Sequence, residues 1–136
     1  MSESKSSYKD LIAWQKAMEM VAMIYDATSE FPSDERFGLV SQLRRAVSVP
    51  SNIAEGKARY SNRDFVRFLR QARGSLAEIE TQVLIAQQRR YLPETQVTTL
   101  TKRLDELGRV LSGIINSLKK SEGDQDESGS GLTTQG

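Results

Sequence analysis

The stretch Gln42–Gly56, QLRRAVSVPSNIAEG, decides the fold because it keeps a helical period around a central proline. Arginine, serine and asparagine fill most of its other positions. Pro50 lacks the N–H that would bond to the carbonyl of Ala46, which costs roughly 3 kcal/mol in a helix interior unless a kink or a polar neighbour accommodates the freed group. We therefore expect a helix that is disturbed near Pro50. The residues expected on its apolar face are Leu39, Leu43, Ala46, Val47, Pro50, Ile53 and Ala54.

Apolar spacings of three and four continue on both sides of this segment and define four helices. They are expected at about 8–30, 33–57, 61–90 and 93–120, and Ser61 reads as the N-cap of the third helix. Connections this short favour antiparallel neighbours. The predicted fold class is all-α, an up-down antiparallel four-helix bundle over residues 8–120.

The two ends of the chain differ from this bundle in composition. Residues 1–7 are polar, and 121–136 are rich in glycine, serine and acidic residues with almost no apolar side chains. Such segments bury too little surface to offset their chain entropy. We expect a flexible N-terminus and a disordered acidic tail.

Length and hydropathy indicate one globular domain that does not enter a membrane. The chain has 136 residues, a one-domain length. It contains no run of eighteen apolar residues, and its polar start is unlike a secretory signal. A cytoplasmic location is the expectation.

The amino-acid composition argues against a catalytic function. The chain has no histidine and no cysteine. Catalytic triads, thiolate nucleophiles, zinc sites and the Glu-x-x-His ligands of di-iron bundles are therefore excluded. A carboxylate magnesium site is disfavoured because Glu78 and Glu80, two apart on a helix, point in different directions. We expect a binding protein with no catalytic residue, no metal and no cofactor.

Positive charge is concentrated in the middle of the chain. The formal net charge is +1, yet residues 36–73 hold nine basic and two acidic residues. On the third helix four arginines share one side, opposite an apolar side, and we call them the arginine stripe: Arg63, Arg67, Arg70 and Arg73. Guanidinium groups bind phosphates in a bidentate manner. Phosphate binding is the favoured interpretation, whereas an anionic protein partner, intersubunit salt bridges and simple solvation are the alternatives.

Two weaker patterns accompany the arginine stripe. Arg45, Ser48, Asn52 and Glu55 form a polar line on the second helix, which is either a binding site or, as we favour, a set of structural groups. In the structural interpretation the serine and asparagine satisfy the backbone around Pro50, while Arg45 and Glu55 find partners on adjacent helices or subunits. Tyr60 lies between Arg59 and Arg63 in a basic loop, where its ring could stack on an unpaired base.

The central segment also resembles a known family signature. SVPSNIAEG is similar to the SIPSNIAEG motif of bacterial four-helix proteins encoded by intervening sequences in 23S ribosomal RNA genes, often labelled S23 ribosomal proteins. Further matching motifs are Tyr8-Lys9-Asp10-Leu11, Trp14-Gln15-Lys16-Ala17, Phe31-Pro32, Phe37-Gly38-Leu39, Gln42-Leu43-Arg44-Arg45-Ala46 and Gly74-Ser75-Leu76-Ala77-Glu78. The resemblance implies a homopentameric helical barrel with a basic surface. It also relates the chain to accessory proteins of reverse transcriptases in diversity-generating retroelements.

The residues and the resemblance together predict a non-enzymatic homo-oligomer that binds structured RNA, or an RNA and reverse-transcriptase complex. The rival hypothesis is a protein-only scaffold that docks an acidic partner, with the acidic tail as an internal competitor. The predicted nucleic-acid-binding residues are Arg44, Arg45, Lys57, Arg59, Arg63, Arg67, Arg70 and Arg73.

Overall fold

The computed structural model describes residues 7–8 and 11–129, and within them it contains helices and turns but no strand. The elements in chain order are α1 (Ile12–Thr28), the 3₁₀ turn η2 (Ser33–Glu35), α2 (Leu39–Arg44), the 3₁₀ turn η3 (Arg45–Val47), α3 (Ser48–Lys57), α4 (Asn62–Gln88) and α5 (Glu94–Gly129). The predicted all-α class is confirmed. The predicted loose residues 1–6 and the tail end 130–136 lie outside the described residues.

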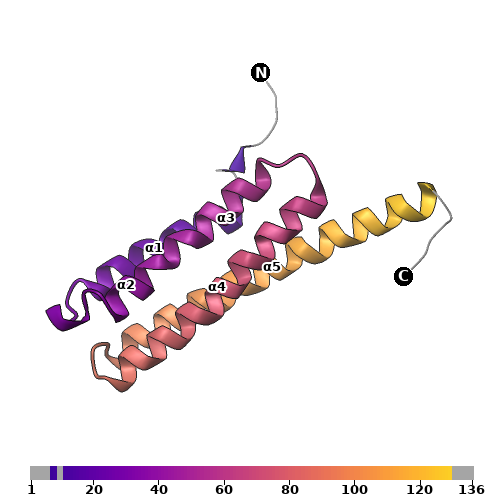
Figure 1. Ribbon diagram of the computed structural model, residues 1–136. Coiled ribbons are helices and arrows are strands. Elements are labelled where there is room, and N and C mark those ends of the chain that lie inside the picture. The colour runs from indigo at the N-terminus through magenta and orange to yellow at the C-terminus, as the bar shows by residue number, and fades with distance from the viewer. Residues whose placement is uncertain (1–6, 9–10, 130–136) are drawn as a thin grey trace.

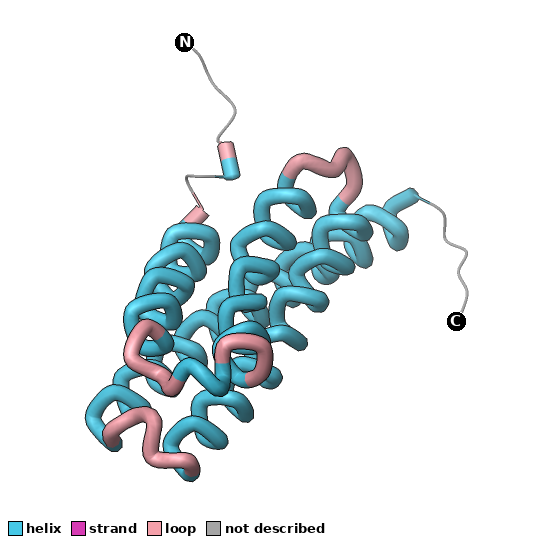
Figure 2. Tube along the Cα trace, turned by 60° about the vertical axis from the view of Figure 1, so that its left-hand side comes forward, coloured by secondary structure: helices cyan, strands magenta, loops and turns pink. Residues whose placement is uncertain are grey.

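The helices α1, α3, α4 and α5 form an up-down four-helix bundle, and the short α2 precedes α3. Figure 1 shows α1 and α3 side by side, with α4 and α5 forming the other pair. Each of the four longer helices contacts two of the others, in the order α1, α3, α4, α5 and back to α1, and the short α2 packs against both α1 and α4. The connections lie at the two ends of the bundle (Figure 2). The predicted antiparallel bundle is therefore confirmed.

The core is filled by one side of each helix. The apolar side predicted for α4 is buried, from Phe65 to Val83, and most of the side predicted for α5 is buried as well, with Leu111 and Ile115 fully enclosed. The largest fully buried side chains are Met20, Ile24, Leu43, Ile53, Leu69, Leu100, Leu107, Leu111, Ile115, Val49 and Val83.

The predicted second helix is broken into two pieces, which corrects the expectation of one helix over 33–57. The turn η3 separates α2 from α3 and ends just before Pro50. The missing proline N–H leaves the Ala46 carbonyl free, and the N–H of Ser48 approaches that carbonyl and the carbonyl of Arg45 instead. A 3₁₀ turn advances each residue by more than an α-helix does, so the apolar face shifts. Val47 is consequently 43% exposed, and Val49 takes its place in the core.

Only part of the apolar surface of α1 is buried. Met20 is 1% exposed and belongs to the core. Met18 and Tyr25 are exposed. The side of α1 that packs into the bundle carries Ala13 and Ala17 together with Met20 and Ile24.

Gly56 lies where α3 packs closely against α4. It is buried in the last turn of α3. A Cβ atom at this position would lie 2.7 Å from Cβ of Phe68 and 2.9 Å from Cδ1 of Phe65. Glycine is therefore required by packing, and not only because it suits the end of a helix.

The ends of α4 are capped by local hydrogen bonds. The hydroxyl of Ser61 accepts a bond of 3.1 Å from the N–H of Asp64, which confirms the predicted N-cap. At the other end Tyr91 N–H donates to the Ala86 carbonyl while Arg90, with φ of 68°, adopts the left-handed conformation. These bonds form a Schellman motif with arginine at the position usually held by glycine.

The last helix is longer than predicted. We expected it to end at Lys119 or Lys120, but α5 continues to Gly129. No proline follows to stop it, and a helix anchored by packing propagates at low cost into adjoining residues. The boundary of the helical region at 120 is therefore corrected to 129.

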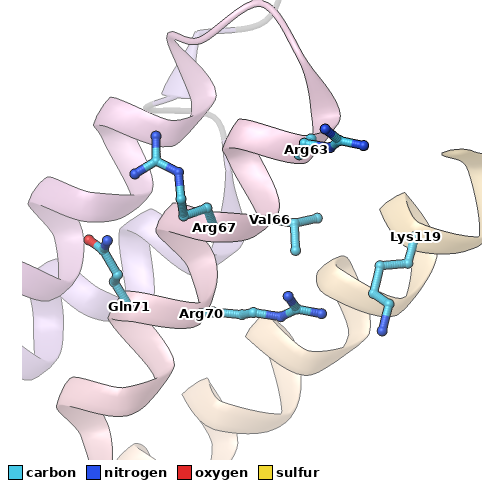
Figure 3. A pocket seen from close by; sticks show the side chains of 6 residues that line it. All are labelled: Arg63, Val66, Arg67, Arg70, Gln71 and Lys119. Carbon is cyan, nitrogen blue, oxygen red and sulfur yellow. The ribbon is translucent and has the colours of Figure 1, made fainter.

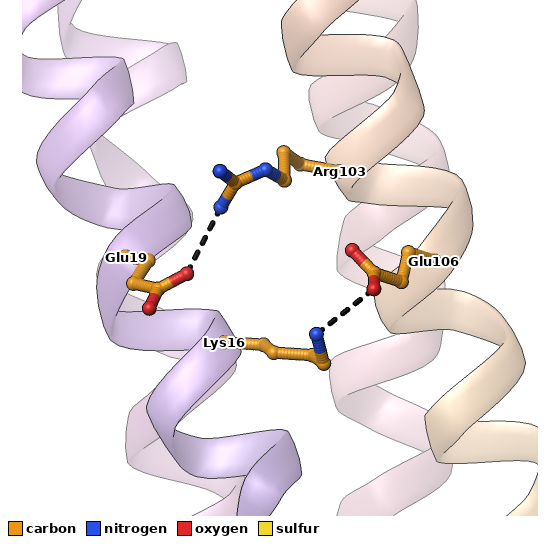
Figure 4. A network of polar contacts seen from close by, with 4 residues as sticks. All are labelled: Lys16, Glu19, Arg103 and Glu106. Atoms are coloured by element: carbon orange, nitrogen blue, oxygen red, sulfur yellow. Dashed lines mark hydrogen bonds and ion pairs between the residues drawn. The ribbon is translucent and has the colours of Figure 1, made fainter.

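Ion pairs join α1 to α5 on the side away from α4. Nζ of Lys16 lies 2.9 Å from Oε2 of Glu106, and Nη1 of Arg103 lies 2.9 Å from Oε1 of Glu19 (Figure 4). The hydrogen bond from Lys16, together with its charge, lowers the pKa of the Glu106 carboxyl. These exposed pairs fix the orientation of the two helices more than they add stability.

Glu35 joins the two connections at the lower end of the bundle. Its carboxylate accepts a bond of 3.1 Å from the N–H of Leu39 and one of 2.9 Å from the hydroxyl of Tyr91. These bonds, the backbone one first, lower the pKa of Glu35. The carboxylate therefore caps the start of α2 and holds the α4–α5 connection against it.

The close approach at Gly56 gives a stability prediction. The Gly56→Ala variant should lose about 1–2 kcal/mol of unfolding free energy, because the new methyl group collides with two phenylalanine side chains that are held in the core. Urea unfolding followed by circular dichroism measures this loss.

Gly74 in the middle of α4 is the matched control, because a Cβ there meets nothing within 4 Å. Gly74→Ala should stabilise the protein by about 0.5–1 kcal/mol through helix propensity. If Gly56→Ala were as stabilising as Gly74→Ala, the close packing of α3 on α4 would be refuted.

Candidate functional site

All four residues of the arginine stripe are exposed, as predicted. Their side of α4 is left free because the opposite side carries Phe65, Phe68 and Leu69 into the core. The helical period thus separates one set of residues that builds the bundle from another that faces solvent.

The first two turns of α4 border a groove that also involves α5. The groove has a volume of about 670 Å³, and its lining residues are Arg63, Val66, Arg67, Arg70, Gln71 and Lys119. We call it the basic groove. Figure 3 shows Arg63 and Arg70 on the side of α4 that faces Lys119, with Val66 between them, whereas Arg67 points away from α5. Three cationic groups from two helices therefore surround an apolar floor.

The arginines of the basic groove differ in how they are neutralised. Nη2 of Arg67 lies 3.5 Å from Oδ1 of Asp64, and its guanidinium covers the Phe68 ring at 4.6 Å from the centroid. Arg63, Arg70 and Lys119 form no ion pair or hydrogen bond with another residue whose side chain the structure describes. Their charges are open to an anion from outside the molecule.

Arg73 is separated from the other three. Its Nη1 donates a hydrogen bond of 3.1 Å to the Ser112 hydroxyl, and it borders a second groove of about 590 Å³ between α4 and α5. That groove also contains Glu80 and Asp105, so its charges are mixed. The uniform arginine stripe expected from the sequence thus ends at Arg70.

Arg44 has a structural role, in contrast to the prediction. Its Nε donates a bond of 2.9 Å to the Thr28 hydroxyl, and its guanidinium lies 4.5 Å from the centroid of the Tyr25 ring. Thr28 in turn donates to the Ile24 carbonyl. These contacts tie α2 to α1, so the side chain is already occupied.

Arg45 faces a different direction from its neighbour. It borders a groove of about 390 Å³ between the α2–η3 segment and α4, which also contains Glu78 and Gln82. Oε1 of Gln82 is buried and has no hydrogen-bond partner among the described residues. Arg45 therefore does not extend the basic groove.

Lys57 and Arg59 lie at the end of α3, near the start of α4. Nη2 of Arg59 lies 2.7 Å from Oε2 of Glu55, and its guanidinium lies 5.0 Å from the Phe68 ring centroid. Nζ of Lys57 lies 6.0 Å from the centroid of Phe65. Both cations cover the aromatic pair beneath Gly56 and keep this end of the bundle positive.

The polar line on the second helix serves structure more than binding. The hydroxyls of Ser48 and Ser75 lie 3.4 Å apart, which links α3 to α4, and Glu55 pairs with Arg59. The Ala46 carbonyl is approached by the backbone of Ser48, not by a serine or asparagine side chain. Ser48, expected to satisfy the backbone at Pro50, contacts Ser75 on α4 instead, and Glu55, expected to find a partner on an adjacent helix or subunit, pairs with Arg59 four residues further along the chain.

Sequence reasoning missed Lys119. Its position on the last helix placed it far from the arginine stripe along the chain, although antiparallel pairing of α4 with α5 brings the start of one beside the end of the other. Counting residues outward from the α4–α5 connection could have revealed this neighbour.

Other kinds of site receive little support. No cluster of acidic residues that could hold a metal ion occurs in the described part of the chain. The described helices also include none with the length and apolar content to cross a membrane.

The comparisons with known proteins agree with this fold. The family model described as 23S rRNA-intervening sequence protein matches residues 9–113. The chain belongs to this family. A crystal structure of a protein of unknown function from the S23 ribosomal protein family of Bacteroides thetaiotaomicron is similar, with a TM-score of 0.72 and 21% identity over 77% of this chain and 96% of that chain. This similarity concerns the fold. Comparison with curated protein sequences finds no match.

Two neighbouring arginines of this family member give the next prediction. Arg44→Ala should cost about 1–2 kcal/mol of unfolding free energy, because it removes a charged hydrogen bond and leaves the Tyr25 ring uncovered. Arg45→Ala should stay within about 0.5 kcal/mol of wild type, as is usual for an exposed side chain. Paired urea unfolding curves measure both. Equal losses would contradict the structural role of Arg44.

Proposed function

We propose that this protein is a non-enzymatic, basic nucleic-acid-binding accessory protein. The observation that carries the proposal is the basic groove, where Arg63, Arg70 and Lys119 project from two helices without neutralising partners among the described side chains. Like charges repel, so leaving them unpaired is unfavourable unless an anion binds there. The nearby Lys57, for which the described side chains provide no ion-pair partner, raises the local potential further.

The apolar floor favours a polyanion over a single small anion. Val66 lies between the cations, and a sugar or base edge can contact it while the phosphates meet the charges. Planar guanidinium groups bind phosphate oxygens in pairs.

Assembly into a ring is a second part of the proposal. Several large apolar side chains remain exposed on the subunit, among them Ile12, Met18, Val47, Leu84 and Ile85. Burying such residues between copies stabilises a closed oligomer. A homopentamer, as the family resemblance implies, repeats the basic groove five times and adds weak contacts through multivalency. A reverse transcriptase that acts on the bound RNA, in the cytoplasm, is the partner we infer.

The rival function is a scaffold that docks an acidic protein on the same cations, with the acidic residues after Lys120 as competitors. The two hypotheses differ in their ligand. A phosphate backbone is continuous and independent of sequence, whereas a protein partner must match the shape of the groove.

Charge reversal in the basic groove tests the proposal. The double variant Arg63→Glu/Arg70→Glu should bind RNA at least about tenfold more weakly than wild type at roughly 50 mM salt, because it removes two phosphate contacts and adds two repulsive charges. Fluorescence anisotropy with a labelled RNA measures the affinity, while circular dichroism and light scattering check that helicity and subunit number are unchanged.

Arg36→Glu/Arg90→Glu is the matched control, since it makes the same change in charge in the α1–α2 and α4–α5 connections. Figure 1 shows these connections at the end of the bundle opposite the start of α4. It should retain most of the affinity. Absence of RNA binding by the wild-type protein, or equal losses in both double variants, would rule out the groove as a nucleic-acid site and leave the scaffold as the better account.

A further inference from the structure

Tyr60 has no role in the fold. Its relative exposure is 107%, so nothing covers its ring. The residue before a helix N-cap often packs its apolar side chain on the fourth residue of the helix, which is Phe65 here. Gly56 and Lys57 take that place on Phe65 instead.

The other tyrosines each have a structural partner. Tyr8 packs edge-on against Trp14, Tyr25 lies under Arg44, and the hydroxyl of Tyr91 bonds to Glu35. Tyr60 makes no such contact with the described residues. A ring that remains exposed to water contributes no burial to the folded protein, so its face is accessible to a ligand.

Tyr60 lies close to the basic groove along the chain. It precedes Arg63 by three residues, and three residues span at most about 11 Å. From Arg63 to Arg70 the helix rises about 10 Å. Stacked nucleotides follow one another at about 3.4 Å along a strand, so this distance corresponds to about three phosphates.

We propose that the ligand of the basic groove is a single-stranded nucleic acid, with its phosphates along Arg63, Arg70 and Lys119 and one unpaired base stacked on Tyr60. This inference rests on the proposed function and adds the class of ligand. Every base has a face that can stack on an aromatic ring, so the contact tolerates any sequence. In a duplex the bases already stack on one another, and exposing one to Tyr60 requires unstacking at a cost of a few kcal/mol.

The experiment measures the binding of one short oligonucleotide by wild type, Tyr60→Ala and Tyr60→Phe. Tyr60→Ala should bind single strands roughly fivefold or more weakly, because it loses the stacking ring. Tyr60→Phe should bind as wild type does, since the ring alone is needed. The slope of log affinity against log salt should be the same for all three, because the phosphate contacts are intact.

Two controls isolate the stacked base. Phe37→Ala removes another highly exposed aromatic residue, which is 88% exposed and next to Arg36 in the α1–α2 connection, and should have no effect. Abasic strands should bind wild type and Tyr60→Ala equally. Single-stranded RNA, single-stranded DNA and a duplex of the same length form the ligand series, and both single strands should bind more tightly than the duplex.

The outcomes separate this inference from the proposed function. If wild type binds with a clear salt dependence but Tyr60→Ala binds equally well, or the duplex binds as tightly as the single strands, the stacking inference is overturned and the nucleic-acid site stands. If wild type binds none of the three ligands, both the stacking inference and the proposed nucleic-acid site are refuted. If an acidic protein binds to the groove and nucleic acid does not, the result supports the rival hypothesis of a protein scaffold.

Discussion

The contact of Gly56 with Phe65 and Phe68 determines how the rest of the bundle is arranged. The absence of a side chain at Gly56 lets α3 approach α4 so closely that a Cβ atom would collide with both phenylalanines. Because Phe65 and Phe68 are three residues apart on one helix face, fixing both sets the rotation of α4 about its axis. The opposite face of its first two turns must then point outward, and that face carries Arg63 and Arg70.

The second determinant is the antiparallel pairing of α4 with α5. It brings Lys119 to the beginning of α4, where it completes the basic groove. Ion pairs between α1 and α5, such as Lys16 with Glu106, hold α5 from its other side. The groove therefore lies on two helices that are each fixed by packing elsewhere, and its cations need no contact with one another.

The sequence predicted the parts of this arrangement that depend on period and capping. The apolar face of α4, the Ser61 cap and the exposure of the arginine stripe follow from residue spacing alone. The roles of Arg44 and Arg45 could not be read in this way. They are adjacent in sequence, yet one is bound to Thr28 and the other borders a groove with Glu78, because neighbouring helical residues point about 100° apart and α2 contacts both α1 and α4. The place of Lys119 in the groove could not be predicted without knowing which helices are neighbours. The position of the 3₁₀ turn could not be predicted either, because it depends on how the packed helices accommodate the hydrogen bond that Pro50 cannot make.

The salt dependence of RNA binding by the full-length wild-type protein tests the central claim most directly. Each phosphate contact to a single strand contributes about 0.7 to the slope of log affinity against log salt, so three contacts per subunit require a slope of about −2 or steeper between roughly 50 and 200 mM salt. A straight line with that slope is the result that the basic groove predicts. A slope near zero, or no binding at the lowest salt, would contradict it.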